Sequence, residues 1–249
     1  MELRRRKFQG VLNILSFNRH FYIWGLFILL LLISSRFLIT WNPYLYWLTV
    51  SGFLYGLSMP LLVSAYVYDQ SGFYQFEWLK KFNLKDASTY LNLNINAGFD
   101  ETSYIIKQIL PQSKLQVYDF YDATKHTEPA IIRARKVSTV YPNTTQVITK
   151  AIPLKNNTVD HIFIVSAIHE IRAHEEQIKF LKECKRVLKN DGQLIIVEHL
   201  RDWPNFIAFT IGFTHFSSKS NWKNALAAAG FNRVEESKFT PFMSIFKCK

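Results

Sequence analysis

Three histidines stand at or beside the ends of short apolar segments, where their side chains could act on a bound ligand. They are His169, His199 and His215, and the pKa of histidine suits it to removing a proton near pH 7. Glu170 follows His169 and Glu198 precedes His199, so either carboxylate could orient a ring or bind a donor. We expect the catalytic residues among His169, Glu170, His199 and His215. The alternative is that these side chains cap helices or are solvated loop charges.

A second set of polar residues could bind a ligand without reacting with it. Asn94, Asn96, Gly98 and Asp100 lie in one segment, and Asp119 lies 21 residues after Gly98, which leaves room for one helix and one strand. Asparagine tolerates the left-handed backbone better than most non-glycine residues, so this segment can form a tight turn. The alternative is an asparagine-rich turn that only ends a strand, with Asp100 stabilising the start of a helix.

Metal chemistry is not expected from this sequence. Neither H-E-x-x-H nor C-x-x-C spacing occurs, and the two cysteines, Cys184 and Cys248, are too few for a four-cysteine zinc site or a disulfide scaffold. We therefore predict a site without a metal.

Short β-type segments alternate with helical ones after residue 69, and these elements must position the polar residues. The alternation predicts an α/β fold with a mostly parallel sheet covered by helices on both faces, where ligands bind at the carboxyl ends of the strands. The last two strands have no helix between them, which predicts an antiparallel pair at the sheet edge. The expected strands are residues 89–95, 114–119, 146–151, 161–166, 193–198, 234–238 and 241–247. The expected helices are residues 73–82, 101–110, 128–136, 175–188 and 219–229, with Arg133, Arg135 and Lys136 as surface or lipid-facing charges.

Composition limits the class of protein. The chain has 249 residues, 49% of them hydrophobic, which is enough to build a core and excludes a disordered chain. Its formal net charge of +11 suggests either nucleic acid or an anionic membrane surface as a partner. No basic-aromatic nucleic-acid motif is present, so we expect no nucleic acid.

Two long apolar segments, residues 21–40 and 44–66, predict a transmembrane helical hairpin. Each is about as long as the 20 helical residues that cross a bilayer core, and residues 37–68 contain no charge. Arg36 lies near the end of the first segment, where its side chain can snorkel to the interface. The alternatives are a buried hairpin of a soluble protein and, for the first segment, a secretory signal.

The charge distribution predicts the orientation of the hairpin. Residues 1–20 carry a net charge of +4, and residues 69–249 carry +6, which is what remains of +11 after the flank and Arg36 are subtracted. The positive-inside rule then places both the flank and the larger domain in the cytoplasm, on the inner (cytoplasmic) membrane.

Four segments carry a resemblance to class I S-adenosylmethionine-dependent methyltransferases. Residues 180–198 resemble the family's helix, its "R-V-L-K-P-G-G" turn and its fifth strand, and residues 152–162 resemble its "L-P-F…F-D-V-V" segment. Residues 166–171 resemble "L-H-H-I", and residues 221–231 resemble "W…L…A-G-F". The chain thus resembles a membrane-anchored, bacterial-type member. The resemblance covers residues 70–249 and implies a Rossmann-like domain with a seven-stranded sheet and S-adenosyl-L-methionine as cofactor.

The resemblance also implies which residues bind that cofactor. Asp119 matches the acid that accepts both ribose hydroxyls in the family. The family's D-x-G-x-G-x-G loop reads Asn92, Asn94, Asn96 and Gly98 here, so the glycine loop is degenerate and only its last glycine remains. No acid follows the third strand, so adenine contacts are expected from apolar and backbone groups. The cofactor-binding residues that we expect are Asn94, Asn96, Gly98, Asp100, Asp119, Phe120, Ala151, Ile152 and Ser166.

The acceptor is expected to be lipophilic. Residues 203–216 are apolar and aromatic, and in relatives the segment after the fifth strand often covers the acceptor. A quinone, a phenolic or polyene pigment, or a lipid headgroup would fit. Two other functions remain open: a catalytically silent protein of this fold that binds a nucleotide or a partner at the membrane, and a nicotinamide-dependent oxidoreductase. The sequence does not determine the oligomeric state.

Overall fold

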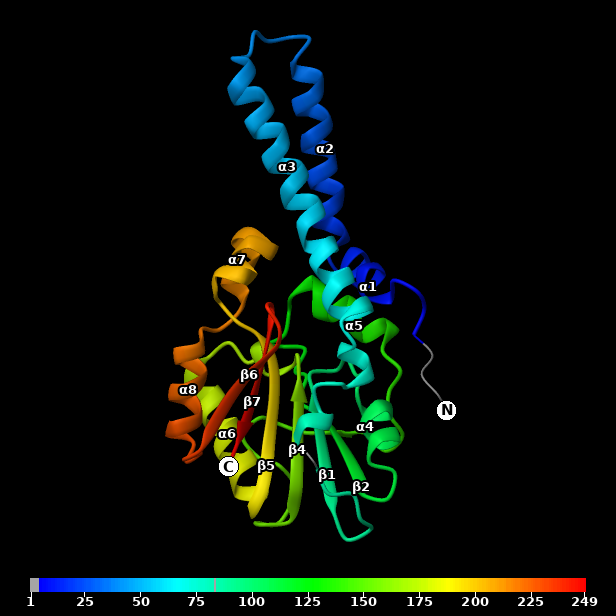
Figure 1. Cartoon of the computed structure of the whole chain (residues 1–249), viewed down its shortest axis with the longest axis vertical. Coiled ribbons are helices and arrows are strands. Elements are labelled where there is room, and N and C mark those ends of the chain that lie inside the picture. The colour runs from blue at the N-terminus through cyan, green and yellow to red at the C-terminus, as the bar shows by residue number, and fades with distance from the viewer. Residues whose placement is uncertain (1–4, 83) are drawn as a thin grey trace.

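Two apolar helices project from one end of an α/β unit in the computed structural model, which describes residues 5–82 and 84–249 (Figure 1). The first four residues of the basic flank, which include Arg4, lie outside the described residues.

The helical hairpin consists of α2 (Arg19–Ser35) and α3 (Pro43–Ser64), and it follows the short helix α1 (Gln9–Phe17). Asn42 caps α3, because its side-chain oxygen accepts the backbone N–H groups of the two residues after Pro43. Among the described residues, one helix, Pro43–Gln75, is long and apolar enough to cross a membrane. A second candidate exists only if α1 and α2, which are bent by 77°, count as one span. α2 ends five residues before the predicted residue 40.

The prediction of a helix over residues 73–82 is wrong. α3 continues as the π-helix η1 (Ala65–Gln70), and two separate 3-10 turns follow, η2 (Phe73–Gln75) and η3 (Lys80–Phe82). Phe73, Phe76 and Trp78 are all fully buried, and the backbone of Phe76 is left-handed (φ 54°). Burying three aromatic side chains this close together requires a folded loop, since one face of a regular helix could not bury all three.

The sheet has seven strands in the order β3-β2-β1-β4-β5-β7-β6. β1 to β5 are parallel, and β7 is antiparallel to both of its neighbours, as the sequence predicts. The strands are β1 (Leu91–Asn96), β2 (Lys114–Asp119), β3 (Thr145–Gln146), β4 (Val159–Val165), β5 (Leu188–His199), β6 (Val234–Thr240) and β7 (Met243–Cys248).

The third strand is much shorter than predicted. After two residues of β3 the chain forms a narrow turn, in which the N–H of Ala151 donates to the carbonyl of Ile148 (3.2 Å). The N–H of Val147 still donates to the carbonyl of Asp119 in β2 (2.9 Å), but residues 148–151 turn away from the sheet and become available to line a cavity.

Helices cover both faces of the sheet (Figure 1). α6 and α8 bury Phe180 and Trp222 in the core on one face, while α4 and the 73–82 loop bury Ile106 and Trp78 on the other. The helices are α4 (Ser103–Ile109), α5 (Pro129–Val137), α6 (His174–Val187), α7 (Trp203–Phe209) and α8 (Lys219–Ala228), with 3-10 turns η4 (Ile168–Glu170) and η5 (Thr210–His215).

Candidate functional site

α1 covers the edge of the sheet where the parallel strands end. The ring of Phe17 in α1 packs edge-on against Phe99, which follows β1, with 5.3 Å between the ring centroids. Arg133 of α5 donates to the carbonyl of Phe17 (2.6 Å), so α1 and α5 are joined above this edge. Residues that follow β1, β2 and β4 thus lie beneath the helix that leads into the hairpin.

The loop after β1 is held by its own side chains. The amide of Asn94 donates to the hydroxyls of Thr102 and Ser103 (2.9 and 2.7 Å), and the amide oxygen of Asn96 accepts the N–H of Gly98 (2.8 Å). Gly98 has a φ of +85°, the left-handed region that favours glycine. The asparagines therefore stabilise the turn, and Asn94 faces the start of α4.

Several buried polar atoms around this loop have no hydrogen-bond partner among the described residues. They are Asn94 Oδ1, Asn96 Nδ2, Asp100 Oδ2 and the hydroxyl of Ser166 after β4. An unsatisfied buried polar group costs about 1–3 kcal/mol. Both donors and acceptors are represented, which matches a ligand with amino, hydroxyl or carboxylate groups. Of these four residues Ser166 lines a cavity, whereas Asn94, Asn96 and Asp100 are not among the lining residues. This mixture of donors and acceptors suits the amino and carboxylate groups at the methionine end of an S-adenosylmethionine molecule.

Asp119 lies at the carboxyl end of β2 and is buried. Its Oδ1 accepts the N–H of Tyr121 (2.8 Å), and its Oδ2 pairs with Nη1 of Arg135 (2.8 Å). The guanidinium also stacks over the ring of Tyr121, 3.9 Å from its centroid. A Cβ added at Gly98 would lie 1.8 Å from Nη1 of Arg135, so the guanidinium fills the space between the loop and the carboxylate.

The prediction that Arg135 is a surface or lipid-facing charge is wrong. Ile131 and Ala134 are buried on the inward face of α5, and Arg135, four residues after Ile131, shares that face. This spacing is the signal that could have identified Arg135 as a site residue.

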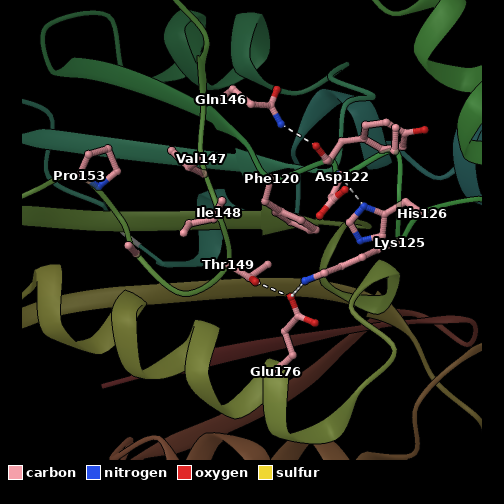
Figure 2. Close-up of a pocket in the computed structure, with 13 residues that line it drawn as sticks. Phe120, Asp122, Lys125, His126, Gln146, Val147, Ile148, Thr149, Pro153 and Glu176 are labelled. Carbon is pink, nitrogen blue, oxygen red and sulfur yellow. Dashed lines mark hydrogen bonds and ion pairs between the residues drawn. The ribbon is translucent and has the colours of Figure 1, made fainter.

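A cavity of about 530 Å³ opens where β2 and β3 end (Figure 2). Phe120 and Ala151, two of the predicted cofactor residues, line it. Ile152 does not, because its N–H donates to Glu183 of α6 (2.9 Å) and its side chain joins the core. Apolar walls and backbone groups at this place would suit a flat heteroaromatic ring.

A second cavity, of about 190 Å³, lies beneath α1. Its lining includes Ala97 and Phe99 after β1 and Ser166, His169 and Glu170 after β4. The strand order β3-β2-β1-β4 makes the two cavities neighbours along one edge. The second cavity combines apolar walls with the predicted catalytic pair His169 and Glu170.

His169 is held between two carboxylates. Its Nδ1 lies 2.8 Å from Oε2 of Glu198, and its Nε2 lies 3.4 Å from Oε1 of Glu170. Burial alone would lower the pKa of His169, but the charge of Glu198 and the contact with Glu170 raise that pKa to about 10. For Glu170 the directions are opposite. Burial alone would raise the pKa of Glu170, but the hydrogen bond and charge of His169 lower that pKa to about 2. The ring is therefore a cation at neutral pH.

His215 approaches His169 from η5, with 5.4 Å between the ring centroids. Burial, followed by the charges of His169 and Arg172, lowers the pKa of His215 to about 3, so its ring is neutral. Donor atoms of His169, Glu170 and His215 lie within 4.8 Å of one another, as metal ligands could. However, Nη2 of Arg172 lies 2.7 Å from both ring nitrogens of His215, so a cation already occupies this side of the cluster.

His199 lies apart from both cavity linings. Its Nε2 is 2.8 Å from the hydroxyl of Tyr68 in η1, and its Nδ1 contacts Asn205 and the carbonyl of Phe242. Burial lowers the pKa of His199 to about 4. The ring is thus neutral and fully bonded, and it connects β5 to the segment that follows the hairpin. A catalytic role for His199 stays a prediction without geometric support.

The sequence and the fold of this chain are similar to those of known proteins. A family model described as a methyltransferase domain matches residues 121–196. A SAM-dependent methyltransferase from Aquifex aeolicus superposes with a TM-score of 0.52 at 23% identity, over 72% of this chain and 93% of that one. The PH0226 protein of Pyrococcus horikoshii OT3 gives 0.51 at 14% identity, over 69% and 85%. A putative O-methyltransferase from Nostoc punctiforme PCC 73102 gives 0.51 at 12% identity, over 79% and 60%.

One curated protein, a highly reducing polyketide synthase from Pyrenophora dematioidea, is 33% identical over 91 residues, which are 31% of this chain and 3% of that protein. The chain therefore spans only a small part of that relative. The structural likenesses establish the methyltransferase fold, and together with the family match they support a class I methyltransferase.

Proposed function

We propose that this protein is an S-adenosylmethionine-dependent methyltransferase that is tethered to a membrane and methylates a lipophilic acceptor. The observation that carries the proposal is the set of unpartnered polar atoms beside the buried carboxylate of Asp119, at the ligand-binding edge of a methyltransferase fold. S-adenosyl-L-methionine is the cofactor, and it supplies a methyl group on a sulfonium.

Asp119 accepts the ribose hydroxyls, and Arg135 leaves Oδ2 of Asp119 when the cofactor binds. Asn96, Asp100 and Ser166 meet the amino and carboxylate groups of the methionine end. The degenerate glycine loop can still bind the cofactor, because the side-chain amide of Asn96 stabilises the turn and Gly98 has no side chain to block the approach of the ligand to the backbone. The cavity lined by Phe120 and Ala151 takes the adenine.

The remaining task of the protein is to align the acceptor with the methyl group and to exclude water. His169 serves as a fixed positive charge in this account. A ring with a pKa of about 10 is protonated at pH 7 and cannot accept a proton from the acceptor. It can instead stabilise an oxygen that has already lost its proton. An acceptor that binds as its anion, such as an acidic phenol or enol, therefore fits better than one that His169 would have to deprotonate.

The hairpin anchors this domain in the inner (cytoplasmic) membrane, with the N-terminus and the α/β domain in the cytoplasm. Support comes from the exposed apolar side chains of α2 and α3, such as Trp24, Leu30 and Leu48, which have no protein partner to cover them among the described residues. The basic flank supplies the orientation.

Calorimetric titration of the detergent-solubilised full chain tests the cofactor assignment. S-adenosylmethionine should bind and NAD(H) should not. Binding of NAD(H) alone would favour an oxidoreductase. Binding of neither would favour a catalytically silent protein, for which the occupation of the Asp119 site by Arg135 is the motivating observation.

A further inference from the structure

α7 and η5 present large apolar side chains outward. The inward side chains of α7 include polar Asn205, which is fully buried and donates to the carbonyl of Phe242 (3.1 Å). Trp203 and Ile211 are 76% and 82% exposed, and Phe206 and Ile207 between them are also exposed. Exposed apolar patches mark contact surfaces, and a helix that lies in a lipid interface presents its apolar side chains in this way.

This apolar face continues the exposed surface of the hairpin. α7 packs beside α3, and the hydroxyl of Tyr55 in α3 donates to the carbonyl of Ile207 (2.5 Å). In Figure 1, α7 stands above the sheet on the same side as the hairpin, well away from the opposite end of the domain. The two exposed apolar surfaces therefore face the same surroundings.

The height of α7 along the hairpin can be estimated from helix geometry. Gly25 of α2 packs against Leu57 of α3, two residues from Tyr55. Gly25 lies six residues after Arg19, the charged first residue of α2, which at 1.5 Å per residue is about 9 Å. If Arg19 lies at the headgroups, α7 lies about 10 Å deeper, near the boundary between headgroups and acyl chains, where interfacial helices reside.

The charges around this level suit an anionic lipid surface. Arg6, Lys7 and Arg19 are exposed at the base of the hairpin, and within the described part of the chain none of them pairs with an acid. The guanidinium of Arg201, just before α7, donates to the carbonyls of Phe216 and Thr214 and pairs with no acid among the described residues. Each such cation is attracted to an anionic leaflet.

We propose that α7 and η5 form a second membrane contact, in which Trp203, Phe206, Ile207 and Ile211 enter the same leaflet that surrounds the base of the hairpin. This inference rests on the proposed tethering and goes beyond it. It also links the lipid surface to the acceptor cavity, because η5 ends at His215, which faces His169. A lipophilic acceptor would then enter from the leaflet beside η5.

Depth-dependent fluorescence quenching tests the contact. The native cysteines, Cys184 and Cys248, are both fully buried, so a bimane label reacts with an introduced cysteine. Three variants of the full chain are placed in phosphatidylcholine–phosphatidylglycerol nanodiscs with or without brominated acyl chains: Ile211→Cys for the contact, Leu54→Cys for the hairpin, and Asn190→Cys for the far end of the domain. The unsubstituted chain controls for labelling of the native thiols.

The proposal expects bromine to reduce the fluorescence at both position 211 and position 54 by about twofold or more, with no change at position 190. Quenching at position 54 without quenching at 211 would overturn the α7 contact and leave the tethering intact. Loss of quenching at position 54 would overturn the tethering itself. Formation of an Ile211→Cys disulfide dimer without quenching would assign this face to a second copy and also overturn the proposal.

Discussion

The two carboxylates at the site edge, Asp119 at the end of β2 and Glu198 near the end of β5, are each paired with a cation, but the pairs differ in solvent exposure. The side chain of Glu198 is 1% exposed, and that of its partner His169 is 16% exposed. Asp119 is paired with Arg135, whose side chain is 33% exposed and reaches the carboxylate from a helix on the surface. We therefore expect the Glu198 pair to be a fixed part of the fold and the Asp119 pair to be exchangeable, because its arginine is the more exposed of the two cations.

The two pairs correspond to two different tasks in the proposed reaction, exchange of the cofactor and orientation of the acceptor. The exchangeable pair lies where the cofactor must enter and leave at each turnover. The fixed pair lies where the acceptor must be held in one orientation. A salt bridge to a solvent-accessible arginine is worth little, so a ligand can displace it, while breaking a buried pair leaves an uncompensated charge.

Removing the histidine of the fixed pair should have the largest effect. His169→Ala leaves Glu198 buried without a counter-charge, which should lower the free energy of unfolding by about 3–5 kcal/mol. Denaturant titration of the solubilised protein measures this change. Arg135→Ala is the matched control and should lower the free energy of unfolding by about 1 kcal/mol or less. Equal losses in the two variants would abolish the distinction between the pairs.

Removing the carboxylate of the exchangeable pair should affect binding instead. Asp119→Ala deletes an acceptor of two charge-assisted hydrogen bonds, so the affinity for S-adenosylmethionine should fall by about 100-fold or more. Isothermal titration of the two proteins measures this loss. An unchanged dissociation constant would remove Asp119 from the cofactor site.

The fixed pair should also give stability a specific pH dependence. The pKa of His169 is about 10 in the folded protein, above its unfolded value of about 6.5. The stabilisation is therefore complete below pH 6.5 and is lost as pH rises towards 10, at up to about 1.4 kcal/mol per pH unit. Unfolding titrations of the native chain and His169→Gln across this range should show the slope only in the native chain. A parallel slope in both would contradict the assignment.

Removing the arginine of the exchangeable pair should have the smallest effect, and it should be a gain. Arg135→Ala leaves Asp119 free for the ribose, so affinity for S-adenosylmethionine should rise by roughly threefold to tenfold, the value of one partly exposed ion pair. Titration calorimetry of the variant reads this directly. Weaker binding would show that Arg135 contacts the cofactor instead of competing with it.

Much of the fold could be predicted from the sequence because local patterns and the sheet agree. β2 begins and ends at the predicted residues, and the final strand pair occupies the expected edge. The 73–82 segment and β3 were mispredicted for a shared reason. In both, the local sequence pattern is regular, but other contacts determine the backbone. Burial of aromatic side chains in the core shapes the 73–82 segment, and a local turn ends β3.

The site was less predictable than the fold. The sequence indicated Asp119 and His169 as candidates, because they lie at the end of one apolar strand and just after another, and the resemblance indicated Asp119 as the ribose acid. It did not identify Arg135, because an arginine in an amphipathic helix usually faces solvent. It also could not show that Glu198 raises the pKa of His169, because that shift depends on a contact between residues 29 positions apart.

Transfer of a tritiated methyl group tests the central claim most directly. The full chain is incubated in nanodiscs with labelled S-adenosylmethionine and a total membrane lipid extract, beside Asp119→Ala as control. The account predicts labelled product in the organic phase that depends on Asp119. Label confined to water-soluble products, or no transfer by a chain that binds S-adenosylmethionine, would contradict a methyltransferase acting on a lipophilic acceptor.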